Sequence, residues 1–144
     1  MKMAIGSDHA GYEYKKFLIS KLKEMDIEVT DHGTDGPDSV DYPDFAHPVA
    51  EAVDNKEVEL GILICGSANG VAMTANKRAN VRAAIAWSSD IAALARQHNN
   101  ANILCIPARF VSKRLAAMML KTFINTTFEG GRHDRRVGKI ACHC

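Results

Sequence analysis

The stretch LGILIC at residues 60–65 is continuously apolar, and the glycine-bearing segment GSANG at residues 66–70 follows it directly. A short apolar run without polar alternation is typical of a strand that is buried on both faces, as in a parallel sheet. The glycines predict a sharp turn, and residues 70–78 predict a helix after it. This strand–turn–helix unit favours an α/β fold.

Apolar runs and amphipathic runs alternate on both sides of this unit. Strands are predicted at residues 2–6, 27–31, 82–87 and 102–106, and helices at 12–25, 45–53, 90–98 and 113–124. Pro43 suits the first turn of one helix, and Ser88 or Ser89 and Ser112 are the predicted caps of two others. Strands that alternate with helices imply a parallel sheet covered on both faces. The predicted fold class is α/β, a three-layer Rossmann-like domain with a five-stranded parallel sheet.

The composition is that of one soluble domain spanning residues 1–144. The chain is 47% hydrophobic and 24% charged, with a net charge of +1, which excludes a disordered protein. No apolar run approaches the ~18 residues of a membrane span, and the N-terminus does not resemble a signal peptide. The four cysteines are too unevenly placed for a secreted disulfide framework. We therefore expect a cytoplasmic protein.

Charge is divided unevenly along the chain. Residues 1–60 carry 6 Lys and Arg against 14 Asp and Glu, whereas residues 61–144 carry 12 against 3. The basic half contains no run of like charges with interleaved aromatic residues, so a nucleic-acid surface is not predicted. A small anionic substrate and an interface between an acidic and a basic half explain the division equally well.

Ligands of parallel α/β sheets bind beyond the carboxyl ends of the strands. The segments predicted there are residues 7–11, 66–70, 88–89 and 107–109. Cys65 ends the buried strand, beside backbone N–H groups and a helix N-terminus. A thiol in that place is expected to titrate low enough to act as a base or nucleophile, and the turn suits an enediolate or a phosphate. The alternative is an inert buried thiol beside a structural turn.

Other interpretations of this turn fail on spacing. A phosphatase loop has a phosphate-binding Arg at the position that Val71 occupies here. The turn also lacks the G-x-G-x-x-G spacing of a dinucleotide site and the Lys of a Walker loop.

Two histidines are further candidates. His9 suits a phosphate, and the adjoining Asp8 either contacts a sugar hydroxyl or caps the helix that follows. His98 is predicted at a helix C-terminus, which favours its imidazolium and suits a general acid. The alternative for His98 is a structural histidine in an interface.

The C-terminal segment holds two other clusters. Arg132, Arg135 and Arg136 suit a phosphate, or they form a solvated basic tail. The terminal Cys142-His143-Cys144 has no fourth ligand in view, so no metal site is predicted there.

Together these motifs resemble the type B ribose-5-phosphate isomerases, within the ribose/galactose isomerase family. The resemblance covers nearly the whole chain, through residues 6–11 (GSDHAG), 65–70 (CGSANG), 98–102 (HNNAN) and 130–133 (GGRH). The family's catalytic base is a cysteine in one branch, where it falls on Cys65, and a glutamate in another, where it would fall on Val71. The resemblance therefore implies that Cys65 is the catalytic base. It also implies that His98 opens the sugar ring. The substrate-binding residues that it implies are Asp8, His9, Gly66, Ser67, Ala68, Asn69, Gly70, Asn99, Arg109, Arg132 and Arg136. Tyr42 is a further candidate for contact with the sugar. Two departures are Ala68, where many members have Gly, and Pro107-Ala108 before Arg109.

The resemblance also implies a reaction of the pentose phosphate pathway. His98 would protonate the ring oxygen of ribose 5-phosphate, and the Cys65 thiolate would remove the proton on C2 to give a cis-enediolate. Ser67 would pass a proton between O1 and O2, and return of the proton to C1 would give ribulose 5-phosphate. No metal or organic cofactor is expected, because the substrate carbonyl already acidifies the C–H bond.

The predicted topology separates these groups within one chain. Cys65 and Asp8 are predicted at the carboxyl edge of the sheet, whereas His98 ends a helix that has returned to the opposite edge. We therefore expect an active site shared across a homodimer or a dimer of dimers, with residues from about 125 to 144 contacting the partner subunit. By the resemblance, the family is dimeric or tetrameric.

Two alternative functions remain open. One is an isomerase of a six-carbon sugar phosphate, such as allose 6-phosphate or galactose 6-phosphate. The other is a non-catalytic sensor that binds a sugar phosphate without turnover. Neither a nucleic acid nor a membrane is an expected partner.

Overall fold

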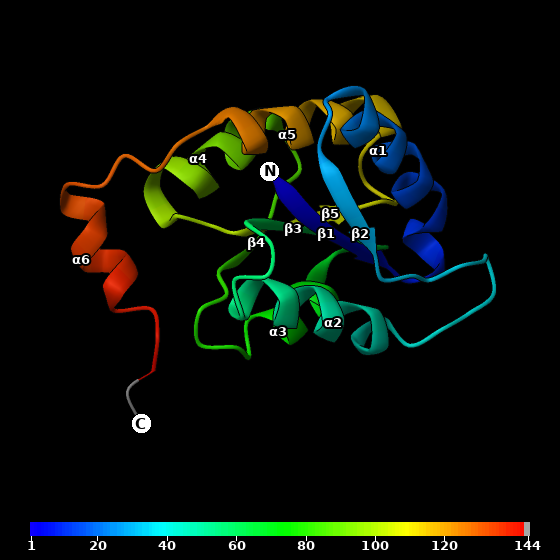
Figure 1. Cartoon of the computed structure of the whole chain (residues 1–144), viewed down its shortest axis with the longest axis horizontal. Coiled ribbons are helices and arrows are strands. Elements are labelled where there is room, and N and C mark those ends of the chain that lie inside the picture. The colour runs from blue at the N-terminus through cyan, green and yellow to red at the C-terminus, as the bar shows by residue number, and fades with distance from the viewer. Residues whose placement is uncertain (143–144) are drawn as a thin grey trace.

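The computed structural model describes residues 1–142 and confirms the predicted α/β fold (Figure 1). All five strands are parallel, in the order β2-β1-β3-β5-β4. Their bounds are β1 Lys2–Ser7, β2 Glu28–Asp31, β3 Leu60–Cys65, β4 Ala83–Ile85 and β5 Ile103–Pro107. The LGILIC stretch is β3, which occupies the centre of the sheet with all six residues buried.

Helices cover both faces of the sheet, which makes three layers (Figure 1). One face carries α1 (Tyr12–Glu24), α4 (Ser89–Asn99) and α5 (Lys113–Asn125), and the other carries α2 (Tyr42–Asp54) and α3 (Asn69–Ala75). A 3₁₀ turn, η1 (His9–Gly11), joins β1 to α1, and α6 (Arg132–Gly138) projects beyond the sheet. Each face has its own apolar cluster, with Leu18, Leu104 and Phe123 in one and Val49, Leu63 and Val71 in the other.

The predicted caps are present where the sequence placed them. The hydroxyls of Ser88 and Ser112 accept hydrogen bonds from the backbone N–H groups of Ile91 and Leu115. Pro43 lies in the first turn of α2, as expected.

Three elements differ from the sequence prediction. Helix α3 ends at Ala75 rather than Arg78, because the Asn76 side chain bonds the backbone N–H and carbonyl of Ala83 at 2.8 and 2.9 Å and turns the chain into β4. Strand β4 spans only three residues, as is common at a sheet edge. Helix α6 was not predicted, because only His133 of its seven residues is buried and no apolar periodicity marks it.

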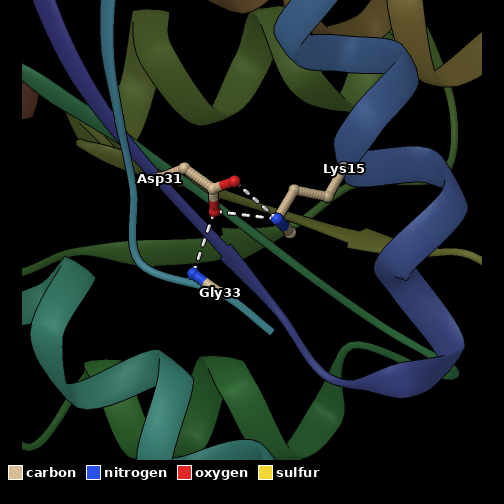
Figure 2. Close-up of polar contacts among 3 residues, drawn as sticks. All are labelled: Lys15, Asp31 and Gly33. Carbon is tan, nitrogen blue, oxygen red and sulfur yellow. Dashed lines mark hydrogen bonds and ion pairs between the residues drawn. The ribbon is translucent and has the colours of Figure 1, made fainter. Parts of the chain in front are cut away.

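A buried lysine ties α1 to the end of β2 (Figure 2). Lys15 is 2% exposed, and its Nζ lies 2.8 and 2.7 Å from the two carboxylate oxygens of Asp31. Oδ1 of Asp31 also accepts from the backbone N–H of Gly33 at 2.9 Å. The chain from Gly33 then bonds the backbone of Ser7, at the end of β1. The ion pair therefore holds the loop that flanks Asp8.

Replacing Asp31 by Asn is expected to destabilise the protein. The buried Lys15 ammonium would lose its counter-charge, and because Asp31 is 38% exposed we expect a loss of about 2 kcal/mol rather than the 3–5 of a fully buried pair. Urea unfolding monitored by circular dichroism measures this loss in the free energy of unfolding. Adding Lys15→Met should recover part of the loss, since an apolar side chain leaves no uncompensated charge at that buried site. Equal stability of the wild type and Asp31→Asn would contradict this role.

Candidate active site

Three loops meet at the carboxyl edge of the sheet, around Cys65 at the end of β3. The N–H of Asp8 donates to the carbonyl of Ile64 at 3.3 Å, and the N–H of Ala108 donates to the carbonyl of Cys65 at 2.9 Å. The N–H of Arg109 donates to the carbonyl of Gly66 at 3.1 Å. Backbone hydrogen bonds thus fix the loops after β1, β3 and β5 relative to one another.

Cys65 is 5% exposed, and its surroundings affect the pKa of its thiol in opposite directions. Burial raises the pKa of Cys65, and the negative charge of Asp8 raises it further, whereas the backbone N–H groups of Val71, Ala68 and Ser67 lower it. The net shift is upward. The sequence-based expectation of a low-titrating thiol is therefore wrong for this structure, because loss of water outweighs the N–H groups of the turn.

Asp8 and His9 are both held by backbone groups. Oδ1 of Asp8 accepts from the N–H groups of Ala10 and Gly11 at 3.0 and 3.2 Å, which confirms the capping alternative. Nδ1 of His9 accepts from the N–H of Val40 at 3.2 Å. In the neutral imidazole the proton then resides on Nε2, which is the donor left for a ligand.

The turn after Cys65 presents small and polar groups. The exposed Ser67 hydroxyl accepts from both the backbone N–H and the side-chain amide of Asn69, at 3.3 and 3.1 Å. Ala68 has φ of +66°, in the left-handed region. That backbone conformation favours glycine, which gives a physical reason for the Gly that the family resemblance places at this position.

Two glycines of the turn allow predicted site residues to approach it. A Cβ on Gly66 would lie 3.1 Å from the Arg109 guanidinium, and a Cβ on Gly70 would lie 2.5 Å from the Tyr42 ring. Arg109 and Tyr42 therefore both lie against the turn beside Cys65. The structure gathers at this edge the predicted residues Asp8, His9, Tyr42, Cys65, Gly66, Ser67, Ala68, Asn69, Gly70 and Arg109.

The remaining predicted residues lie at the opposite edge. His98 and Asn99 end α4, a few residues before β5 begins, and Arg132 and Arg136 belong to α6. Figure 1 shows α6 beyond the amino ends of the strands, whereas η1 and the start of α1 follow the carboxyl end of β1. One chain therefore keeps these four residues away from Cys65, as the predicted topology implied.

Two residues near His98 were missed by the sequence interpretation. The rings of His98 and His133 stack with centroids 4.3 Å apart and planes 12° apart. The Glu129 carboxylate lies 3.8 Å from Nε2 of His98 and 3.5 Å from Nε2 of His133. The four-residue spacing of Glu129 and His133 is the only sequence signal for this contact, and it is a weak one.

A cavity of about 520 Å³ also opens at this second edge. It is basic, and its lining includes Lys77, Arg78, Arg82, Asn99 and Ile140, but not Cys65. This cavity is therefore distinct from the Cys65 thiol. Of the segment Cys142-His143-Cys144, residues 143 and 144 lie outside the described residues.

Comparison with known proteins identifies relatives of this chain. The family model described as ribose/galactose isomerase matches residues 3–140. The chain is 48% identical to a probable ribose-5-phosphate isomerase B of Mycoplasma genitalium, over 94% of this chain and 91% of that protein. The chain belongs to the ribose/galactose isomerase family.

Solved structures of family members have the same fold. A ribose 5-phosphate isomerase from Thermotoga maritima superposes with a TM-score of 0.95 at 46% identity, covering 97% of each chain. The Mycoplasma genitalium isomerase B crystallised with bound ribulose 5-phosphate gives 0.93 at 47% identity, covering 96% of this chain and 93% of the other. Within residues 1–142, no helix is long and apolar enough to cross a membrane.

Proposed function

We propose that this family member interconverts ribose 5-phosphate and ribulose 5-phosphate through a cis-enediolate. One observation carries the proposal. A buried thiol at the end of the central strand faces a turn of backbone N–H groups, in a chain 47% identical to an isomerase that holds ribulose 5-phosphate. A thiolate can remove the C2 proton, and N–H groups can stabilise the oxyanion that forms.

The other residues of the carboxyl edge suit substrate binding. Nε2 of His9 and the Arg109 guanidinium are donors for the phosphate. Asp8 and Tyr42 contact the sugar, and the Ser67 hydroxyl passes a proton between O1 and O2. The reaction needs no metal or organic cofactor, because the carbonyl next to C2 makes its proton acidic.

The ring-opening acid comes from a second subunit in this proposal. His98, Asn99, Arg132 and Arg136 lie at the opposite edge of their own chain, so a homodimer is required to bring them to Cys65. The domain spans residues 1–144, and its segment from about 125 onward contacts the partner. Because the base is a free thiol, a reducing compartment such as the cytoplasm suits the enzyme.

Rates on three sugar phosphates test the proposed substrate. With EDTA present, we expect kcat/KM for ribose 5-phosphate to exceed the values for allose 6-phosphate and galactose 6-phosphate by about tenfold or more. Faster turnover of a six-carbon substrate would contradict the five-carbon assignment. Binding of all three without any product would indicate the non-catalytic sensor instead.

The pH profile provides an independent test of Cys65 as the base. The thiol must lose its proton to act, and its pKa is raised, so kcat/KM should rise tenfold per pH unit on the alkaline side of neutrality and then level off. Asp8→Asn removes the charge that raises this pKa and keeps the capping oxygen, so the rising limb should shift to lower pH. The exposed Glu57→Gln is the control and should leave the limb in place. A profile that Asp8→Asn does not move would contradict the assignment.

A further inference from the structure

His98, Glu129 and His133 form a compact cluster at the edge of the sheet opposite Cys65. The Glu129 carboxylate oxygen lies 3.8 and 3.5 Å from the two Nε2 atoms, and the three candidate ligand atoms all lie within 4.8 Å of one another. The side chains come from the end of α4, the loop after α5 and the start of α6. The elements are far apart in sequence, so the fold itself brings the three groups together.

The backbone holds this cluster in place. The N–H of Glu129 donates to the carbonyl of Gln97 at 3.0 Å, which fixes the loop beside His98. Gly130 and Gly131, with φ of +69° and +58°, then turn the chain so that His133 faces back toward α4. His133 is 6% exposed and stacks on His98. The backbone therefore holds Glu129 and His133 near His98 before any ligand binds, which reduces the conformational entropy lost on binding.

We propose that this cluster is a site for Zn²⁺, held by Nε2 of His98, Nε2 of His133 and the Glu129 carboxylate. Two imidazoles and one carboxylate form a ligand set that zinc uses with an open fourth position. Ligands about 2.1 Å from a tetrahedral ion lie about 3.4 Å from each other, so the carboxylate already lies near the required separation from both rings. Mg²⁺ and Ca²⁺ prefer oxygen ligands and are not expected to bind.

One movement is required for this coordination. A metal lies in the plane of each imidazole that binds it, and the planes of the stacked rings are nearly parallel. One ring must therefore turn out of the stack. His98 is the ring that turns, because its side chain is 39% exposed whereas that of His133 is 8% exposed.

The consequence for catalysis rests on the proposed function. Nε2 of His98 cannot both bind zinc and protonate the ring oxygen of the sugar. Zinc at this site therefore inhibits ring opening rather than assisting the reaction. The inhibition should be weaker with acyclic substrate, which needs no ring opening.

Zinc binding is measured first, without reference to activity. Isothermal titration uses the whole chain with Cys142→Ser and Cys144→Ser, so that the terminal cysteines do not contribute. We expect one Zn²⁺ per chain, and a dissociation constant raised about tenfold or more by His133→Gln and by Glu129→Gln. His47→Gln, which removes an exposed histidine of α2, is the matched control and should change it less than twofold. Equal zinc affinity in His133→Gln and His47→Gln would overturn the site.

Inhibition is then measured on ribose 5-phosphate with the same variants. In the parent and in His47→Gln, zinc should inhibit turnover over the concentration range in which it binds, and EDTA should restore the rate. Glu129→Gln should need about tenfold more zinc for half-inhibition. Zinc that binds without inhibiting would overturn the link to His98. If the chain turned over no sugar phosphate at all, the proposed function would fail, while the titration would still decide the metal site.

Discussion

Cys65→Ala is expected to lower kcat/KM for ribose 5-phosphate by about 10³-fold, because removal of a positioned general base costs 10²–10⁴. The thiol lies at the end of β3 beside the N–H groups of Ser67, Ala68 and Val71, and no other described side chain in that turn can accept the C2 proton at neutral pH. A stopped-time assay of ribulose 5-phosphate measures the loss.

Cys105→Ala is the matched control for this variant. Cys105 lies fully buried on β5 beside β3, and burial holds the pKa of its thiol far above the ordinary range. It cannot serve as a base, so its removal should cost stability and leave kcat/KM within about threefold of the wild type. A Cys65→Ala enzyme as active as Cys105→Ala would contradict the mechanism.

Mixing two inactive variants is expected to restore activity. Cys65→Ala and His98→Ala chains should each be inactive alone, whereas under the proposed shared site their heterodimer would contain one site with an intact Cys65 and an intact His98. Random exchange of subunits makes half of the dimers heterodimers with one working site of two, so about a quarter of wild-type activity should return. The variants are unfolded together, refolded and assayed.

Two controls make this experiment interpretable. Size-exclusion chromatography should show that the mixture is dimeric. A mixture of Cys65→Ala with Cys65→Ser chains should give no restored site, because both variants lack the thiol. If Cys65→Ala with His98→Ala recovers no more activity than the separate variants, then the site is not shared between subunits.

Much of the fold could be predicted because the local sequence signals for strands and helices agree with the positions of these elements in the folded sheet. The apolar run at residues 60–65 has no polar position, so it fits only the centre of a covered sheet, and it became β3 with the predicted bounds. The hydroxyls of Ser88 and Ser112 mark helix starts through hydrogen bonds that span three residues. Such short-range signals are visible in the sequence.

What the sequence missed depends on contacts between distant segments. Lys15 occurs on an amphipathic helix, where a lysine is normally exposed, and only its partner Asp31 explains its burial. The His98–Glu129–His133 cluster likewise needs α4 and α6 side by side. The pKa of the Cys65 thiol was also predicted wrongly. The sequence pattern reveals the nearby N–H groups, but it does not reveal the loss of water that raises this pKa.

Conversion of ribose 5-phosphate in D₂O, followed by NMR, tests the central claim most directly. In the proposed mechanism, the proton that the Cys65 thiolate takes from C2 would exchange with solvent before it returns to C1. We therefore predict that the EDTA-treated protein forms ribulose 5-phosphate with deuterium at C1, and that Cys65→Ala neither forms the product nor exchanges the C2 proton. Binding of ribose 5-phosphate with no product and no exchange in the wild type would contradict the assignment of this chain as an isomerase.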